Sequence, residues 1–242
     1  MTILNEPEQA YAPYYWREAC EELMHKDVVL KKIILEYNSD FLVTRKDPFN
    51  TLVRSIVGQQ ISVAAAQSIW NKVEAICRVG VNPGSVLSLS FEDLRGAGLS
   101  GRKVEYIKDL AKDFHTSRIN SDYWYDMDDE SVIKELCSIR GIGRWTAEMF
   151  LIFNLLRPNI LPLDDIGLIN AISGNYFDGE AVSRKKANEL GEKWAPWRTV
   201  ATWYLWRSID PIPVAYYLIK SSIFKSFSLC TQDSFLFPFL VM

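Results

Sequence analysis

The sequence has few cysteines and histidines and no long apolar run, and each shortage argues against a class of protein. Its cysteines lie far apart, with no C-x-x-C pair, at Cys20, Cys77, Cys137 and Cys230. This spacing argues against a structural zinc site, an iron–sulfur cluster and a disulfide framework. Only 2 histidines occur in 242 residues, which leaves little for a histidine metal site. No stretch is long enough for a membrane span, and residues 1–15 lack the pattern of a signal peptide.

The chain also lacks an excess of positive charge. It has 27 Lys and Arg against 30 Asp and Glu, for a formal net charge of -3. A wholly basic nucleic-acid binder is therefore excluded, although a local basic strip is not. The hydrophobic fraction of 48% and charged fraction of 24% are those of an ordinary globular protein of one or two domains.

What the sequence has in abundance is helical periodicity. Ala65, Ile69 and Val73 recur every four residues behind Ser62, a plausible N-cap, and residues 145–156 are apolar nearly all round. Alternating strand patterns are scarce, so we predict an all-α fold. Residues 221–242 are rich in Phe and Ser, and they fit either a docked apolar tail or an unstructured end.

A turn with two glycines separates two predicted helices at residues 136–147. Gly141 and Gly143 permit positive φ angles and leave backbone N–H groups exposed at the start of the second helix. Such a helix start binds phosphate, and Arg140 and Arg144 would add charge. The alternative is a plain turn between two helices with Gly at the C-cap.

A pair of aspartates, Asp164 and Asp165, precedes an apolar helical stripe. We assign Asp164 as the N-cap, which leaves Asp165 free to face a cleft and stabilise developing positive charge. The alternative is that both acids only favour the helix dipole. Among the abundant aromatic residues most belong in the core, and a few could line a pocket that stacks a flat ring.

Four stretches in this order resemble the helix–hairpin–helix superfamily of base-excision DNA glycosylases, and within it the 3-methyladenine DNA glycosylase II branch. They are the residues 50–62, Gly98-Leu99-Ser100 with Lys103, the hairpin 141–147, and Leu161-Pro162-Leu163-Asp164-Asp165. The resemblance spans about residues 48–213. It implies a two-lobed all-α fold with a central cleft, one lobe formed by residues 48–157 and the other by 1–47 plus 158–242.

The resemblance also implies a reaction. After base flipping, Asp165 would stabilise the sugar cation or orient water while an alkylated purine such as 3-methyladenine or 7-methylguanine leaves. The substrate pocket maps onto Trp145, Trp206 and Met149, where Met149 replaces a family tyrosine. Bifunctional relatives carry a Schiff-base lysine at the position of Trp145, so a monofunctional, hydrolytic enzyme is implied.

The partner implied is double-stranded DNA containing alkylated bases. The residues mapped onto DNA contacts are Gln60, Arg102, Lys103, Arg140, Gly141, Gly143 and Arg144. Gln60 stands where the bacterial relative has an apolar intercalating wedge, and Arg140 stands where the hairpin usually has Pro. No cofactor is expected, although such hairpins often hold a monovalent cation, Na⁺ or K⁺, on three backbone carbonyls, here those of Cys137, Ile139 and Ile142.

Two other functions stay open. One is a non-catalytic binder of DNA structure that keeps the hairpin without turnover. The other is a glycosylase for another lesion, such as hypoxanthine or uracil; a neutral base leaves poorly without a protonating group, and His25 and His115 match no family pocket position. We expect a monomer, not membrane-bound, in the cytoplasm with the nucleoid in a bacterium or in the nucleus of a eukaryote.

Overall fold

The structure is a computed structural model that describes residues 12–44 and 46–209. Throughout these two ranges the regular elements are helices and no strand occurs, which confirms the all-α prediction. None of these helices is long and apolar enough to cross a membrane. Residues 221–242 lie outside the described residues. The helices follow one another as α1 (Trp16–Lys26), α2 (Val28–Glu36), α3 (Pro48–Gly58), α4 (Val63–Cys77), α5 (Pro83–Ser88), α6 (Phe91–Gly96), α7 (Gly101–His115), η1 (Asp122–Tyr125), α8 (Asp129–Cys137), α9 (Arg144–Phe153), α10 (Ile166–Tyr176), α11 (Arg184–Gly191), η2 (Glu192–Trp194) and α12 (Arg198–Ile209).

Side-chain caps set many of the helix starts. Ser62 accepts a hydrogen bond from the backbone N–H of Ala65 at the start of α4, which confirms the predicted cap. Ser100 does the same for α7, and Asp128 for α8. Each cap satisfies one of the N–H groups that the first helical turn leaves without a partner.

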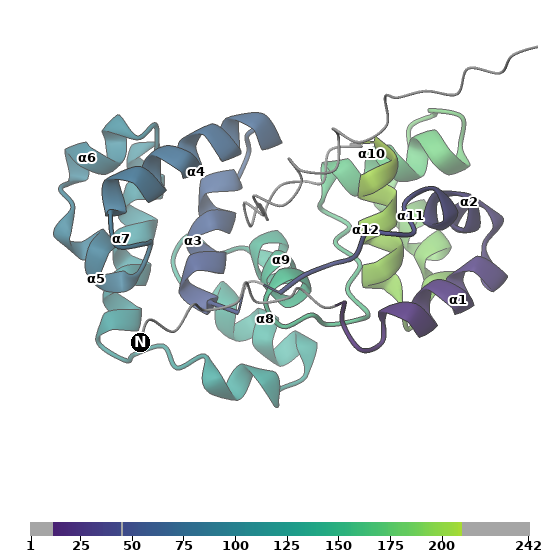
Figure 1. The fold of residues 1–242 in the computed structure, drawn as a ribbon, viewed down its shortest axis with the longest axis horizontal. Coiled ribbons are helices and arrows are strands. Elements are labelled where there is room, and N and C mark those ends of the chain that lie inside the picture. Colours follow the sequence, from purple (N-terminus) through teal and green to yellow (C-terminus); the bar gives the residue numbers. More distant parts are fainter. Residues whose placement is uncertain (1–11, 45, 210–242) are drawn as a thin grey trace, which may run out of the picture.

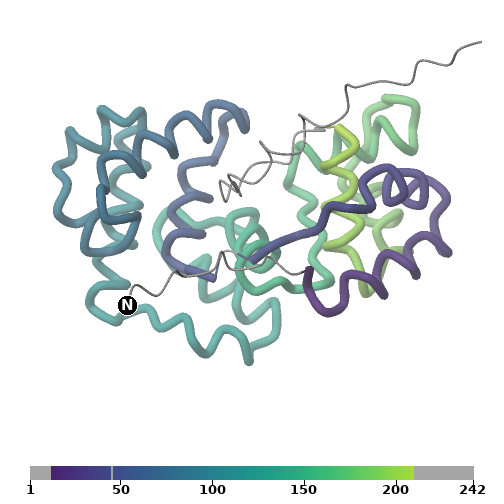
Figure 2. The backbone as a smooth tube through the Cα atoms, in the orientation of Figure 1, coloured from purple at the N-terminus to yellow at the C-terminus, as the bar shows by residue number. Residues whose placement is uncertain are grey.

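The helices gather in two groups (Figures 1 and 2). In the first, α3 packs against α4, α7 and α9, with α5 and α6 on α7 and α8 on α9. In the second, α12 packs against α1, α2 and α10, so segments from both ends of the described chain meet there. The lobe boundaries given above, residues 48–157 against the remainder, stay a prediction.

Helix α9 packs against α3 and α8 in the first group. All its residues from Thr146 to Phe153 are buried, which confirms the expectation of a helix apolar nearly all round. One of them, Glu148, is charged. Burying a carboxylate is costly unless it is paired, so this residue needs a specific partner.

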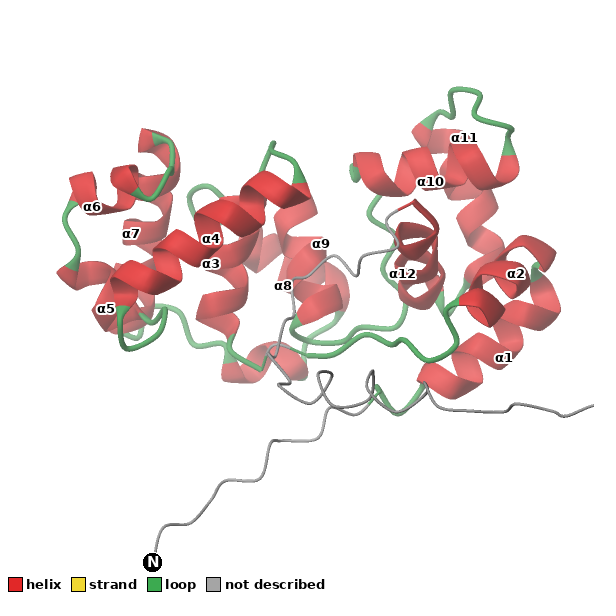
Figure 3. Ribbon diagram, turned by 45° about the horizontal axis from the view of Figure 1, so that its top comes forward, coloured by secondary structure: helices red, strands yellow, loops and turns green. Residues whose placement is uncertain are grey.

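The connector of residues 154–165 runs from α9 to α10 and is anchored at several points (Figure 3). The Arg157 guanidinium donates to the carbonyls of Trp124, Tyr125 and Met127. The hydroxyl of Tyr15 donates to the Leu156 carbonyl at 2.7 Å. These bonds hold the first part of the connector to η1, to the loop after η1 and to the residue before α1.

Candidate active site and nucleic-acid interface

The hairpin between α8 and α9 depends on one glycine for its shape. Gly141 has φ +87°, a conformation that glycine adopts without strain. A Cβ at this position would clash with the ring of Tyr106 on α7. The hairpin therefore packs on α7 so closely that no side chain fits at residue 141.

Gly143 has a different role. It is the N-cap of α9 with φ -99°, so of the two glycines only Gly141 uses the positive φ that both permit. No side chain caps α9, and a Cβ at Gly143 would meet nothing within 4 Å. The C-cap of α8 is Ser138, which excludes the alternative of a simple glycine C-cap. The uncapped, open start of α9 is a geometry that suits an anion such as phosphate.

One residue that stabilises this hairpin, Gln59, carries no sequence signal for that role. The side-chain nitrogen Nε2 of Gln59, the C-cap of α3, donates to the Gly141 carbonyl at 2.9 Å and to Oγ1 of Thr146 at 3.0 Å. Gln59 thus joins the end of α3 to both sides of the hairpin turn. Its neighbour Gln60 is exposed and has φ +56°, so the chain turns sharply at the predicted wedge position.

Lys103 and Arg102 lie next to each other on the first turn of α7 but differ in surroundings. The Lys103 ammonium donates to the carbonyls of Val57 and Gln59, both at 2.8 Å, and burial lowers its pKa. It therefore occupies the negative end of the α3 dipole. Arg102 is exposed. The phosphate contacts predicted for both residues are not tested by these bonds; because the Lys103 ammonium already has two carbonyl partners, we expect Arg102 to be the one that contacts DNA.

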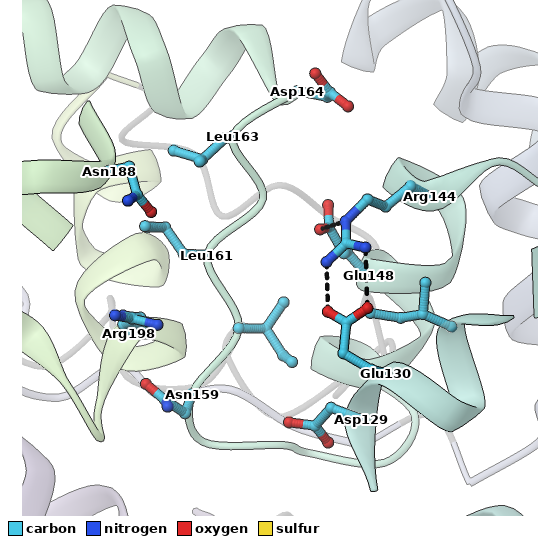
Figure 4. A pocket seen from close by; sticks show the side chains of 12 residues that line it. Asp129, Glu130, Arg144, Glu148, Asn159, Leu161, Leu163, Asp164, Asn188 and Arg198 are labelled. Atoms are coloured by element: carbon cyan, nitrogen blue, oxygen red, sulfur yellow. Dashed lines mark hydrogen bonds and ion pairs between the residues drawn. The ribbon is translucent and has the colours of Figure 1, made fainter. Parts of the chain in front are cut away.

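The hairpin arginines are each held by two carboxylates. Arg140 donates to Asp109 at 2.8 Å and to Glu105 at 2.6 Å, and these hydrogen bonds raise its pKa. Arg144 donates to both oxygens of Glu130, at 2.6 and 3.1 Å, and through Nε to Glu148 at 3.0 Å (Figure 4). Both guanidinium groups are more than half exposed, so they remain within reach of a ligand.

The start of α10 corrects one assignment. Asp165, not Asp164, is the N-cap, and its Oδ1 accepts from the Leu168 N–H at 2.7 Å. A turn closed by the bond from the Asp165 N–H to the Pro162 carbonyl leaves Asp165 as the residue directly before the helix. Asp164 is half exposed and pairs with Arg184 at 2.8 Å.

Asp165 is nevertheless the residue at which the predicted pocket residues meet. The indole N–H of Trp206 donates to Oδ1, and the indole N–H of Trp145 donates to Oδ2, both at 2.9 Å. Three elements thus converge on one carboxylate: the start of α9, the start of α10 and the end of α12. The motif pattern predicts both tryptophans in the site for their ring faces, whereas their N–H bonds to Asp165 depend on the packing of α9, α10 and α12.

Two further residues decide the shape of this site. Gly167 lies next to the hydrogen bond between Asp165 and Trp206. A Cβ at this position would be 3.0 Å from Oδ1 of Asp165 and 3.6 Å from the Trp206 ring. Trp206 also stacks on Phe153, with ring centroids 5.9 Å apart. Met149, the third predicted pocket residue, is only 5% exposed, so its place in a substrate pocket stays a prediction.

The predicted cation ligands are the backbone carbonyls of Cys137, Ile139 and Ile142. The Ile139 carbonyl accepts the Ile142 N–H at 3.1 Å, which leaves one lone pair free. Three carbonyl oxygens in one turn suit a hard cation. Among the described residues, no group of His, Cys, Asp and Glu side chains forms a metal site.

A helical hairpin with an open helix start, facing a carboxylate held by two indoles, defines a class of DNA-repair protein. The family model described as "HhH-GPD superfamily base excision DNA repair protein" matches residues 53–196. The chain therefore belongs to this superfamily.

Particular relatives can be named. The chain is 31% identical over 182 residues to DNA-3-methyladenine glycosylase 1 of Schizosaccharomyces pombe, which is 74% of this chain and 80% of the relative. It is similar to the structure of the S. pombe 3-methyladenine DNA glycosylase in complex with abasic DNA, with TM-score 0.72, 30% identity, and coverage of 79% and 96% of the two chains. A DNA-3-methyladenine glycosidase structure from Bacillus halodurans gives TM-score 0.66 and 35% identity, with 79% and 89% covered.

Proposed function

We propose that this protein is a monofunctional DNA glycosylase that hydrolyses the N-glycosidic bond of alkylated purines such as 3-methyladenine and 7-methylguanine. The observation that carries the proposal is the Asp165 carboxylate, held by Trp145 and Trp206 beside a hairpin suited to phosphate. The relatives' names, DNA-3-methyladenine glycosylases, support the substrate class.

The reaction requires the protein to stabilise positive charge on the sugar. As the base departs, positive charge develops on the deoxyribose, and a fixed carboxylate lowers the energy of that state. Alkylated purines carry positive charge and are good leaving groups, so no protonating residue is needed. Asp165 would stabilise the sugar cation or orient the attacking water.

The two oxygens of Asp165 are unequal. Oδ1 accepts two hydrogen bonds, from Leu168 and Trp206, whereas Oδ2 accepts one, from Trp145. A carboxylate oxygen has two lone pairs. Oδ2 therefore keeps the acceptor capacity, and we assign it to face the reacting sugar carbon or the water.

Hydrolysis without strand cleavage is expected from Trp145, the second residue of the buried helix α9. Trp145 occupies the position where bifunctional relatives carry a lysine, and its indole N–H is bound to Asp165. An indole cannot form a Schiff base, so no lyase step is available from this position.

The DNA itself would lie across the hairpin. In this proposal Gly141, Gly143, Arg140, Arg144 and Arg102 face the phosphate backbone, and the exposed Gln60 fills the gap left by the flipped base. The hairpin carbonyls would hold Na⁺ or K⁺. We further propose a monomer that acts where the genome lies, with the nucleoid of a bacterium or in the nucleus of a eukaryote.

The experiment is base release from DNA treated with a methylating agent. We expect free 3-methyladenine and 7-methylguanine, and abasic strands that break only after added alkali. Release that persists in Asp165→Asn would show that another group is the catalyst. Tight binding to damaged DNA without release would favour the non-catalytic binder, and release of neutral hypoxanthine alone would favour another lesion.

A further inference from the structure

A cavity of about 500 Å³ lies beside α9. Figure 4 shows carboxylates and arginines directed toward it from α8, α9, the connector and α12. The residues that line it do not include Asp165, Trp145 or Trp206, so it is separate from the proposed catalytic carboxylate. The charged residues that line it are Asp129, Glu130, Arg144, Glu148, Asp164 and Arg198.

Glu148 is the buried acid of this cavity. The residue is 5% exposed. Its Oε1 accepts from Nε of Arg144, while its Oε2 has no hydrogen-bond partner among the described residues. Burial raises its pKa to about 7, against the lowering effect of Arg144. Its charge is therefore stabilised chiefly by one arginine.

That arginine lies where phosphate is expected. Arg144 is the first residue of α9, directly after the open N-cap Gly143. It forms a bidentate ion pair with Glu130, and the side chains of both residues are more than half exposed. Such exposed ion pairs are weak, and a guanidinium binds phosphate as well as carboxylate. A DNA phosphate at the start of α9 would compete for the same donors.

We propose that Arg144 exchanges partners when DNA binds. Its guanidinium leaves Glu130 and Glu148 for a backbone phosphate, and the Glu148 carboxylate takes one proton from the solvent. This inference rests on the proposed placement of DNA at the hairpin. Glu148 acts through Arg144 and is a positioning residue, since it need not touch the DNA.

The other charged groups around the cavity keep their own partners. Asp129 pairs with Arg157, Asp164 with Arg184, and Arg198 with Glu192. Glu130 does lose Arg144, but it is exposed and water replaces the lost partner. Glu148 is buried, and the nearby charges of Asp164 and Glu130 raise its pKa further. The proton therefore goes to Glu148.

The proton taken up by Glu148 sets the sign of the pH dependence of DNA affinity. The complex holds more protons than the free protein, so DNA affinity falls as the pH rises above about 7. The steepest slope expected is about tenfold in affinity per pH unit, which corresponds to one proton.

The test is calorimetric titration of the whole protein with a short duplex that carries a tetrahydrofuran abasic-site analogue. Heats measured in two buffers of different ionisation enthalpy give the number of protons taken up. At about pH 7.5 we expect uptake of roughly half to one proton in the wild type and none in Glu148→Gln. Glu148→Gln should match the wild-type affinity at about pH 6 and exceed it at about pH 8.

Glu130→Gln is the matched control, because it removes the other carboxylate partner of Arg144 but not the buried acid. It should tighten DNA binding slightly and keep the proton uptake. If the wild type binds DNA without taking up more protons than Glu148→Gln, the inference is overturned while the proposed function stands. If no DNA binds at all, both fall.

The pKa of Glu148 can also be measured directly in the wild-type protein, so that no variant has to fold. The side-chain carboxyl carbon of Glu148, followed by ¹³C NMR, should titrate near pH 7 in the free protein and at a higher pH in the complex. An unchanged or lower midpoint in the complex would overturn the exchange. Base release at saturating DNA, measured in parallel, reports on the proposed function separately.

Discussion

The start of α10 and the hairpin before α9 place a carboxylate in opposite surroundings. At α10, Asp165 receives three hydrogen bonds from neutral N–H groups that belong to the fold. At the hairpin, Glu148 has one charged partner, Arg144, which is itself half exposed and shared with Glu130. One carboxylate is held firmly and the other by a partner that can leave.

This difference matches what the two places would have to do. A group that stabilises a transition state works best when its position does not change during the reaction. A DNA-binding surface must instead give up its internal ion pairs to the phosphates. The contrast between the fixed α10 start and the exchangeable hairpin can be tested by substitution on each side.

The largest effect is expected at Asp165. Asp165→Asn keeps the helix cap but removes the negative charge, so single-turnover base release should fall by about 100-fold or more. Asp164→Asn is the matched control, because this neighbour is half exposed and pairs only with Arg184. A similar loss in both variants would contradict the assignment.

The next effect concerns the indole N–H groups. Trp145→Phe and Trp206→Phe keep an aromatic face but remove a hydrogen bond to a charged group, and base release should fall about 10- to 100-fold for all substrates alike. Trp206→Leu also removes the ring face, so release of cationic bases should fall about 2- to 30-fold more than release of neutral ones. Rates are compared at equal folded fraction. A Trp206→Leu loss that is the same for both classes would mean that the ring only packs.

The two hairpin glycines test different properties. Gly141 tests the close packing of the hairpin on α7, and Gly143 tests the access of a phosphate to the start of α9. Gly141→Ala forces a Cβ against Tyr106 at a positive φ, so the free energy of unfolding should fall by about 1–3 kcal/mol. Gly143→Ala meets no neighbour and should leave stability nearly unchanged, yet weaken DNA binding by crowding the phosphate. Thermal unfolding and DNA affinity are measured for both. Equal stability of the two variants would contradict the close approach of the hairpin to α7.

The salt dependence of DNA binding distinguishes the hairpin arginines, which we expect to contact phosphate, from Lys103, which we do not. The double variant Arg140→Ala/Arg144→Ala should reduce the slope of log affinity against log salt by about 0.9 for each lost phosphate contact. Lys103→Met should leave that slope unchanged and lower stability instead, since its ammonium holds the end of α3. A reduced slope in Lys103→Met would show that this lysine also contacts phosphate.

The last effect is on stability against pH and does not involve DNA. The pKa of Glu148 in the fold is about 7, above its ordinary value of 4.5. The folded state therefore holds a proton that the unfolded chain has lost, and this contribution to stability declines as the pH rises from about 4.5 to about 7. Relative to Glu148→Gln, the wild type should lose stability across that window and no further above it. Parallel denaturant curves measure the difference.

Much of the fold could be predicted because it depends on neighbours in sequence. The Ser62 cap, the glycine turn and the apolar helix that begins near residue 145 are local features, and each was found, although that helix ends at Phe153 rather than at residue 156. The position of Asp165 beside the predicted tryptophans also came from motif order. The helix cap was assigned one residue early because two adjacent aspartates cap equally well by composition, and only the turn before them decides.

Other features could not be read from the pattern. Gln59 bracing Gly141, and Lys103 holding the Val57 carbonyl, join residues 82 and 46 positions apart. The local sequence around a glutamine or a lysine does not show whether its side chain makes a hydrogen bond within the protein or contacts DNA. Glu148 likewise stood in the sequence as one polar residue on an apolar helix, and its raised pKa comes from burial.

The sequence by itself determined the helical character of the fold, the Ser62 cap, the glycine at the hairpin turn and the order of the motifs. These follow from backbone conformation and apolar periodicity, which act over a few residues. The tertiary structure decided which oxygen of Asp165 receives which indole, and which arginine neutralises Glu148. Those outcomes depend on how α9, α10 and α12 pack, and packing brings together groups that the chain keeps far apart.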